Sequence, residues 1–182
     1  MRANAVIAPA TTAVLTALIA ACASTPTPVA PVVPASLQLP DRVVLLQEVP
    51  ATGVQIYDCA ASKADPLRFE WVFRAPEADL FDTNGRRIGK HYAGPTWESV
   101  DGSTVVGEVK GRDDGPDPDA IPWLLLAAKS ASGSGAFGRV QSIQRINTVG
   151  GKAPEGGCSQ ATAGKEARVP YKATYYLYVP AP

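Results

Sequence analysis

The residues best suited to chemistry gather in one short stretch of the chain. It holds the only histidine, His91, then Trp97 and Glu98 side by side, and Asp101 three residues further on. An indole face offers a flat apolar platform for a sugar or a peptide, and polar side chains beside it orient a ligand. With Arg145, these residues form the candidate ligand-binding site. The alternative is a core tryptophan, an edge histidine and an exposed glutamate, as in many β domains.

No specific catalytic pattern accompanies these residues in the sequence. Glu98 with Asp101, Asp82 or Asp119 could supply the two carboxylates of glycan hydrolysis, but no spacing fixes a second carboxylate near Glu98. His91 has no Gly-x-Ser-x-Gly motif to accompany it as part of a catalytic triad. One histidine also cannot build a histidine-rich metal site. We therefore expect no enzyme, no metal and no cofactor. A small envelope hydrolase acting on glycan is the alternative.

An acidic loop with two prolines occupies residues 111–119, and calcium binding is an alternative for it. It lacks the Asp-x-Asp-x-Asp-Gly spacing of an EF-hand, and the twelfth position counted from Asp113 falls on Leu124 instead of glutamate. We interpret this loop as a solvated turn.

Two dipeptides predict hairpins around the candidate site. Asp101-Gly102 lies between strand-like runs and predicts a type I′ turn, in which both central residues have positive φ. Asn84-Gly85 predicts a second hairpin between residues 78–82 and 87–88. The candidate site is thus expected on antiparallel strands.

Strand-like segments continue along the rest of the chain. There are 17 prolines and 16 glycines, and no long segment after the N-terminal region has a 3.6-residue apolar period. Residues 121–128 are the most apolar run and could be a central strand or a short helix. The other predicted strands are residues 42–49, ended by Pro50, and residues 53–59, 68–74, 140–146 and 168–179. These segments predict an all-β fold, a single antiparallel β-sandwich or barrel-like domain at residues 41–182.

The N-terminal segment predicts export. Residues 1–21 carry one basic residue and then an uncharged apolar run, as in a signal peptide. Leu-Ile-Ala-Ala-Cys at 18–22 resembles the lipobox of bacterial lipoproteins. The resemblance implies that Cys22 is lipidated and anchors the protein to a membrane, on the periplasmic side of the outer membrane if the cell is Gram-negative. An ordinary signal peptide ending in Ala-x-Ala at 21–23 is the alternative.

A proline-rich tether is expected to follow the lipidated cysteine. Residues 22–40 are uncharged and have repeated prolines, so we expect a disordered or extended tether that could span about 50 Å at about 3.1 Å per residue. The formal net charge of the chain is zero, which gives no indication of a nucleic-acid partner.

The other two cysteines, Cys59 and Cys158, form an even pair in an exported protein. A structural disulfide is the simplest interpretation in an oxidising compartment. Neither cysteine has the close Cys or His neighbour of a zinc site, and a catalytic thiol would have to stay reduced after export.

Several motifs in order resemble one family across residues 42–179. It is a bacterial and fungal family catalogued as a domain of unknown function, number 3455. The resemblance implies the family and its fold but no activity. The motifs include Gly-Val-Gln-Ile-Tyr-x-Cys at 53–59, Gly-x-His-x-Ala-Gly-Pro-x-Trp-Glu at 89–98, Ile-Pro-Trp-Leu-Leu-Leu at 121–126 and Val-Pro-Tyr at 169–171.

From these features we expect a cell-envelope lipoprotein that acts as a non-enzymatic binding or interaction module. Its partner would be an envelope glycan or protein.

Overall fold

The computed structural model describes residues 28–40 and 42–182. The predicted signal peptide and lipobox, including Cys22, lie outside the described residues. Within residues 28–40 and 42–182, no helix is both long enough and apolar enough to span a membrane.

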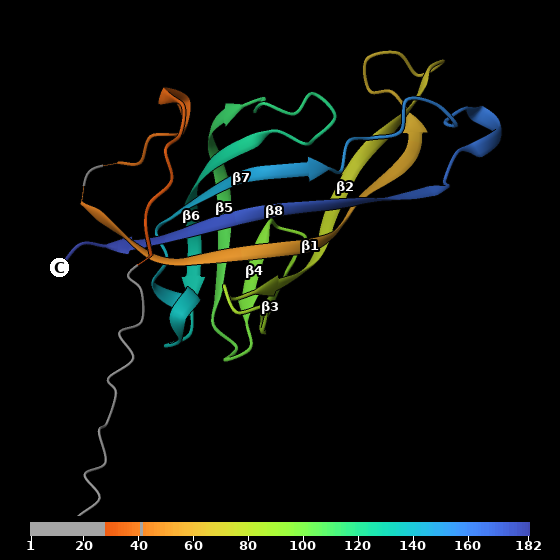
Figure 1. The fold of residues 1–182 in the computed structure, drawn as a ribbon. Helices are drawn as coiled ribbons and strands as arrows, with labels where there is room; N and C mark the ends of the chain where they lie inside the picture. Colours follow the sequence, from red (N-terminus) through yellow and green to blue (C-terminus); the bar gives the residue numbers. More distant parts are fainter. Residues whose placement is uncertain (1–27, 41) are drawn as a thin grey trace, which may run out of the picture.

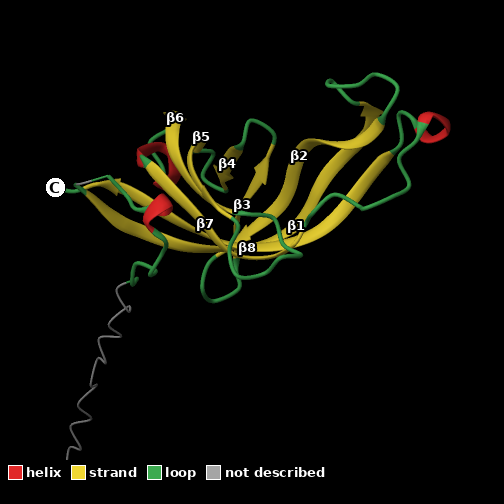
Figure 2. Ribbon diagram, turned by 90° about the horizontal axis from the view of Figure 1, so that it is seen from above, coloured by secondary structure: helices red, strands yellow, loops and turns green. Residues whose placement is uncertain are grey.

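Eight antiparallel strands form one closed barrel, in which each strand pairs with its neighbour in the sequence (Figures 1 and 2). Pairing of the first strand with the last closes the barrel. This confirms the predicted all-β fold and identifies it as a barrel. The strands are β1 (Val43–Ala61), β2 (Phe69–Phe81), β3 (Arg87–Tyr92), β4 (Thr96–Ser99), β5 (Thr104–Asp113), β6 (Trp123–Ser132), β7 (Ser142–Gly150) and β8 (Glu166–Pro180). Three short 3-10 helices accompany them: η1 (Ala35–Leu37), η2 (Ala136–Arg139) and η3 (Gln160–Thr162).

The prediction that Pro50 ends a strand is wrong, because β1 continues through it to Ala61. Pro50 lies opposite Thr174 of β8, and the pairing of β1 with β2 begins only at the next residue, Ala51. A proline lacks the N–H donor and is tolerated where a strand has a partner on one side only. The apolar run at 121–128 is a strand, β6, which begins just after Pro122.

Both predicted hairpins are present, but the turn at Asp101-Gly102 is not of type I′. Gly102 has a φ of 81°, whereas Asp101 is not among the residues with positive φ. The Asp101 carboxylate instead accepts the backbone N–H of Ser103 at 2.8 Å, which holds a longer loop in place. In the other hairpin, Gly85 has a φ of 80°. The Asp82 carboxylate accepts the backbone N–H of Asn84 at 3.0 Å in the same turn.

Inward-facing side chains fill one part of the barrel as a core. Alternation along each strand directs every second residue inward. Val49, Leu80, Ile143 and Leu177 are fully buried there. A second cluster lies outside the barrel wall, where Leu37 covers Ile146, Tyr176 and Tyr178.

The last residues of the predicted tether pack on the barrel. Leu37 of η1 is fully buried. Its carbonyl accepts the Gln144 side-chain N–H at 2.8 Å, and Gln144 in turn accepts the Tyr178 hydroxyl at 2.7 Å. A Cβ at Gly111 would collide with the Ser36 carbonyl, so this glycine permits the close approach. The packed structure thus begins before residue 41.

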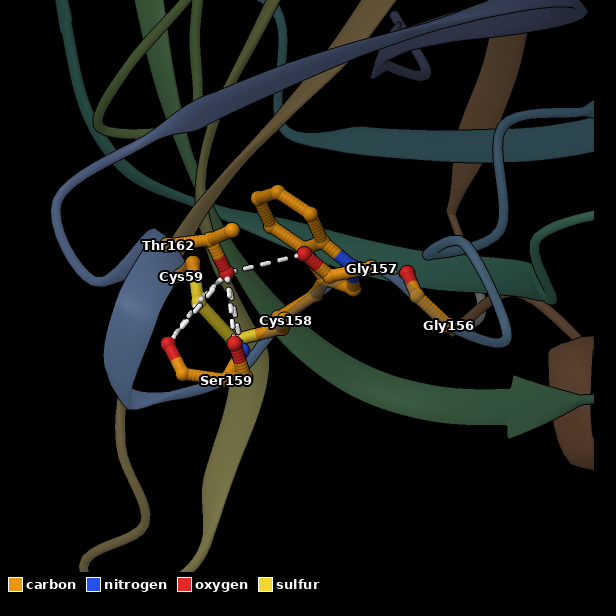
Figure 3. The surroundings of a disulfide bond; sticks show 7 residues. Cys59, Gly156, Gly157, Cys158, Ser159 and Thr162 are labelled. Atoms are coloured by element: carbon orange, nitrogen blue, oxygen red, sulfur yellow. Dashed lines mark hydrogen bonds between the residues drawn. A yellow bond between two sulfur atoms is a disulfide. The ribbon is translucent and has the colours of Figure 1, made fainter.

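Strands β1, β2 and β8 extend past the others on one side of the barrel (Figure 1). The predicted disulfide is confirmed at the far end of this extension, where Cys59 and Cys158 are joined with their Cα atoms 5.3 Å apart. Figure 3 shows Thr162 beside the bridge, donating its hydroxyl to the Gly157 carbonyl at 2.9 Å and accepting the backbone N–H of Ser159 at 2.8 Å.

We predict that replacing both cysteines, Cys59→Ala with Cys158→Ala, lowers the free energy of unfolding substantially. The bridge joins residues 99 positions apart. For a loop of about 100 residues the chain-entropy model gives an upper figure of about 4.7 kcal/mol. Urea denaturation measures the change. Thr162→Val is the control, because it removes the neighbouring hydroxyl but keeps the bridge, and should cost only about 1 kcal/mol. A double-alanine variant as stable as the wild type would contradict this account.

Candidate functional site

The barrel contains a cavity of about 600 Å³ that is open to solvent on the side of Phe73 and Val109. This volume lies within the range of about 300–1,000 Å³ that is usual for small-molecule sites. Its lining residues come from strands at both ends of the sequence. Tyr57 of β1 and Phe73 of β2 lie opposite each other and line the cavity beside the extended strands. Its apolar lining includes Phe73, Pro76, Pro95, Val109, Ile121, Leu124 and Leu126, and its polar lining includes Gln55, Tyr57, His91, Trp97, Arg145 and Tyr175.

Three aromatic rings form one wall of this cavity. His91 of β3 lies directly opposite Trp97 of β4 in the sheet register, so both side chains point inward. Their rings stack with centroids 4.2 Å apart. Tyr175 of β8 meets both edge to face, at 5.2 Å from His91 and 5.3 Å from Trp97. Such contacts fix the ring orientations beyond what burial alone would do.

The buried His91 is a neutral imidazole with a defined tautomer. Nδ1 lies 2.8 Å from the Thr96 carbonyl oxygen, which can only accept, so Nδ1 carries the proton. Nε2 is therefore left as an acceptor. Burial lowers the pKa of His91 to about 3, although the hydrogen bond to Thr96 opposes the change, and the positive charge of Arg145 lowers the pKa further.

Two buried donors that line the cavity have no hydrogen-bond partner among the described residues. They are Nε1 of Trp97 and Nε2 of Gln55. Trp97 is 1% exposed and Gln55 is 2% exposed. A buried donor without a partner costs about 1–3 kcal/mol, so such atoms are uncommon in folded proteins and often mark functional positions. Trp97 packs so closely over Gly107 that a Cβ there would lie 2.9 Å from the indole.

Arg145 of β7 brings a positive charge into the same cavity. It lies opposite Tyr175 of β8 and Leu124 of β6, and is half-buried. Its Nε and Nη2 both donate to the Pro122 carbonyl, at 3.1 and 2.7 Å. Among the described residues, no carboxylate lies within 4 Å of its guanidinium nitrogens.

The other charged residues lining the cavity are also arginines. Arg74 forms ion pairs with Asp58 and Glu166, and Arg112 forms one with Asp114 at 3.2 Å. No aspartate or glutamate of the described chain lines the cavity. The lining therefore carries positively charged side chains and, among the described residues, no negatively charged ones.

The structure brings together three of the five predicted site residues, His91, Trp97 and Arg145. Glu98 lies next to Trp97 in β4 and so points to the other face, where it accepts the Tyr92 hydroxyl at 2.8 Å. The hydrogen bond from Tyr92, followed by the one from Lys90, lowers the pKa of Glu98.

Asp101 has a structural role in its loop. Its carboxylate accepts the backbone N–H groups of Ser103 and Ala136, at 2.8 and 3.1 Å. Hydrogen bonds from Ser103 lower the pKa of Asp101 to about 2.

Sequence reasoning missed Gln55 and Tyr175. Gln55 lies in the strand predicted at residues 53–59, and its side chain lines the cavity. A glutamine in an otherwise apolar strand could have signalled a polar interior position. Tyr175 is one of several tyrosines in β8, and only the register shows that it faces His91 and Trp97.

Metal binding finds no support in the described part of the chain, where no three His, Cys, Asp or Glu side chains come together. The predicted loop at 111–119 begins within β5, which ends at Asp113, and continues as local turns. In these turns Asp113 accepts the N–H of Gly115 at 2.9 Å and Asp117 accepts that of Asp119 at 2.9 Å.

The fold and the site define a closed antiparallel barrel with an internal cavity. The profile of the family described as "Protein of unknown function (DUF3455)" matches residues 40–179. The chain therefore belongs to this family, as its motifs indicated. Comparison with curated proteins gave no match, and comparison with solved structures gave none.

We predict that His91 makes the stability of the protein depend on pH. Its pKa of about 3 in the folded chain is below its ordinary value of 6.5. The unfolded chain then binds more protons below pH 6.5, so the free energy of unfolding falls as the pH falls from 6.5. The loss is at most about 1.4 kcal/mol per pH unit, or about 2 kcal/mol between pH 6.5 and pH 5.

Urea denaturation across this pH range checks the prediction. His91→Gln should flatten the slope by that amount, whatever its stability at neutral pH. Equal slopes for the two proteins would mean that His91 takes up its proton equally in the folded and the unfolded chain, so that its pKa is not lowered by folding.

Proposed function

We propose that this protein is a non-enzymatic binding module of the cell envelope that holds a small, mostly apolar molecule inside its barrel. The observation that carries the proposal is the cavity of about 600 Å³, with apolar walls and two buried donors that lack partners. A largely apolar pocket with a few placed polar groups is the usual form of a small-molecule site.

The apolar interior favours a small ligand over a glycan laid across the surface. Trp97 was expected as an exposed platform, but it is 1% exposed and stacks on His91. A ligand that contacts Trp97 must therefore enter the barrel. The side of the cavity lined by Phe73 and Val109, each 51% exposed, offers an apolar route.

The hydrolase alternative receives no support from the geometry. Glycoside hydrolysis uses two carboxyl groups about 5–9 Å apart in one cleft. No carboxylate of the described residues lines the cavity. Glu98 and Asp82 are engaged by Lys90 and Arg86 respectively, each at 3.1 Å.

A lipid on Cys22 would place this barrel at a membrane. The sequence at 18–22 supports this part of the proposal, and the disulfide of Cys59 with Cys158 suits an oxidising compartment outside the cytosol. Several acyl chains give a stable anchor, because each buried CH₂ contributes about 0.8 kcal/mol.

We predict that a neutral apolar fluorophore, N-phenyl-1-naphthylamine, binds the full chain with one site per molecule. Cys22→Ser is included so that no attached acyl chain competes. Leu124 lines the cavity. A bulky Leu124→Trp should therefore fill the cavity and weaken binding at least tenfold, as measured by the rise in fluorescence.

Val149→Trp is the matched control, because Val149 is 56% exposed and does not line the cavity. It should leave the affinity unchanged. Equal loss in both tryptophan variants, or no saturable binding to the starting protein, would refute a ligand inside the barrel.

We also predict that Cys22→Ser releases the protein from the membrane fraction of the producing bacterium. Cell fractionation and an intact mass lacking the acyl groups would report the loss of the anchor. Ala23→Ser, which alters the next residue and keeps the thiol, is the control. A protein that stays membrane-bound without Cys22 would contradict lipidation there.

A further inference from the structure

Arg145 is a charged residue of the cavity that has no ion-pair partner among the described residues. A guanidinium has five N–H donors and stays charged at all ordinary pH values. Two of the five donate to the neutral carbonyl of Pro122. A half-buried arginine usually pairs with an aspartate or a glutamate. Among the described residues, no carboxylate oxygen lies within 4 Å of the Arg145 guanidinium nitrogens.

The groups around Arg145 do not compensate its charge. The Tyr175 and Tyr171 hydroxyls lie 3.3 Å apart, and burial raises the pKa of both, so they stay protonated and neutral. His91 is neutral too, because burial lowers its pKa to about 3. Among the described residues that line the cavity, Arg145 therefore has no negative charge near it.

The unpartnered atoms in the cavity wall share one chemical character. Nε1 of Trp97 can only donate a hydrogen bond, and Nε2 of Gln55 is also a donor. A ligand that satisfies these atoms supplies acceptors. An anionic oxygen pair satisfies a guanidinium best, because it accepts two parallel charge-assisted hydrogen bonds.

The rest of the lining limits what accompanies that acceptor group. Ile121, Leu124 and Leu126 line the interior, while Phe73 and Val109 lie at the exposed side. Such walls favour an apolar body, because burying it gains about 25 cal/mol for each Å² removed from water.

We propose that the ligand is an apolar molecule with one terminal carboxylate, and that Arg145 binds this carboxylate inside the barrel. The inference rests on the proposed small-molecule function and adds the charge class of the ligand.

Three probes with the same ten-carbon chain test it: decanoate, decan-1-ol and decylamine. Each is titrated at pH 8 against the full chain with Cys22→Ser, with displacement of N-phenyl-1-naphthylamine as the readout. Decanoate should bind at least tenfold more tightly than decan-1-ol, and decylamine should bind most weakly. The preference for decanoate should diminish with added salt.

Variants assign the preference to one side chain. Arg145→Met should reduce the decanoate affinity to that of decan-1-ol while decan-1-ol itself binds as before. Arg145→Lys keeps the charge and should retain part of the preference, which guards against misfolding of the methionine variant. Arg87→Met is the matched control, because Arg87 pairs with Asp79 and does not line the cavity. It should keep the preference.

The outcomes separate the two proposals. Equal binding of decanoate and decan-1-ol, or a preference for decylamine, would overturn the carboxylate inference and leave the small-molecule site intact. A preference for decanoate that survives Arg145→Met would also overturn it. If neither the fluorophore nor any probe binds, the proposed function fails and this inference fails with it.

Discussion

Pairing of the first strand with the last is the constraint on which the rest of the structure depends. β1 runs antiparallel to β8 from Val43, opposite Pro180, to Asp58, opposite Glu166. This closure pairs the backbone groups of both strands and joins the two ends of the sheet into a barrel. It also shields the core residues from bulk water, Val49, Leu80, Ile143 and Leu177 among them. A buried polar side chain on the inner face then forms hydrogen bonds either with other groups inside the barrel or with a bound ligand.

The interior is divided between a packed core and a cavity, and the division follows the side chains along the strands. In β8, Leu177 and Tyr175 both belong to the core, but only Tyr175, two residues earlier, also lines the cavity. In β7, Ile143 is fully buried in the core and Arg145 reaches the cavity. The core and the disulfide supply stability, which lets the other part of the barrel tolerate unpartnered donors that cost about 1–3 kcal/mol each. Conflicts of this kind are expected at functional sites.

The charge distribution in the cavity depends on which of its ionisable side chains are paired or neutral. At its rim, Arg74 and Arg112 are paired with carboxylates on the outer surface. Deeper inside, burial keeps His91 neutral and the tyrosines protonated. Arg145 alone keeps an uncompensated charge near this wall, in surroundings less polar than water, where its attraction for an anion is stronger than at an exposed surface. The chemistry that the site favours is thus recognition of an acceptor-rich group, without the paired carboxylates of an acid–base catalyst.

The sequence alone determined the features that depend on local pattern. Alternation and the Gly and Asn turn residues predicted the strands and both hairpins, and the even pair Cys59 and Cys158 predicted the disulfide. Its motifs also indicated the family. Register and closure were decided only by the tertiary structure, because they depend on contacts between residues far apart in the chain. They place His91 against Trp97 and Tyr175, add Gln55, and turn Glu98 to the other face. One residue's shift in register would reverse each of these faces. For that physical reason a list of chemically capable residues could be read from the sequence, whereas the cavity that unites three of them could not.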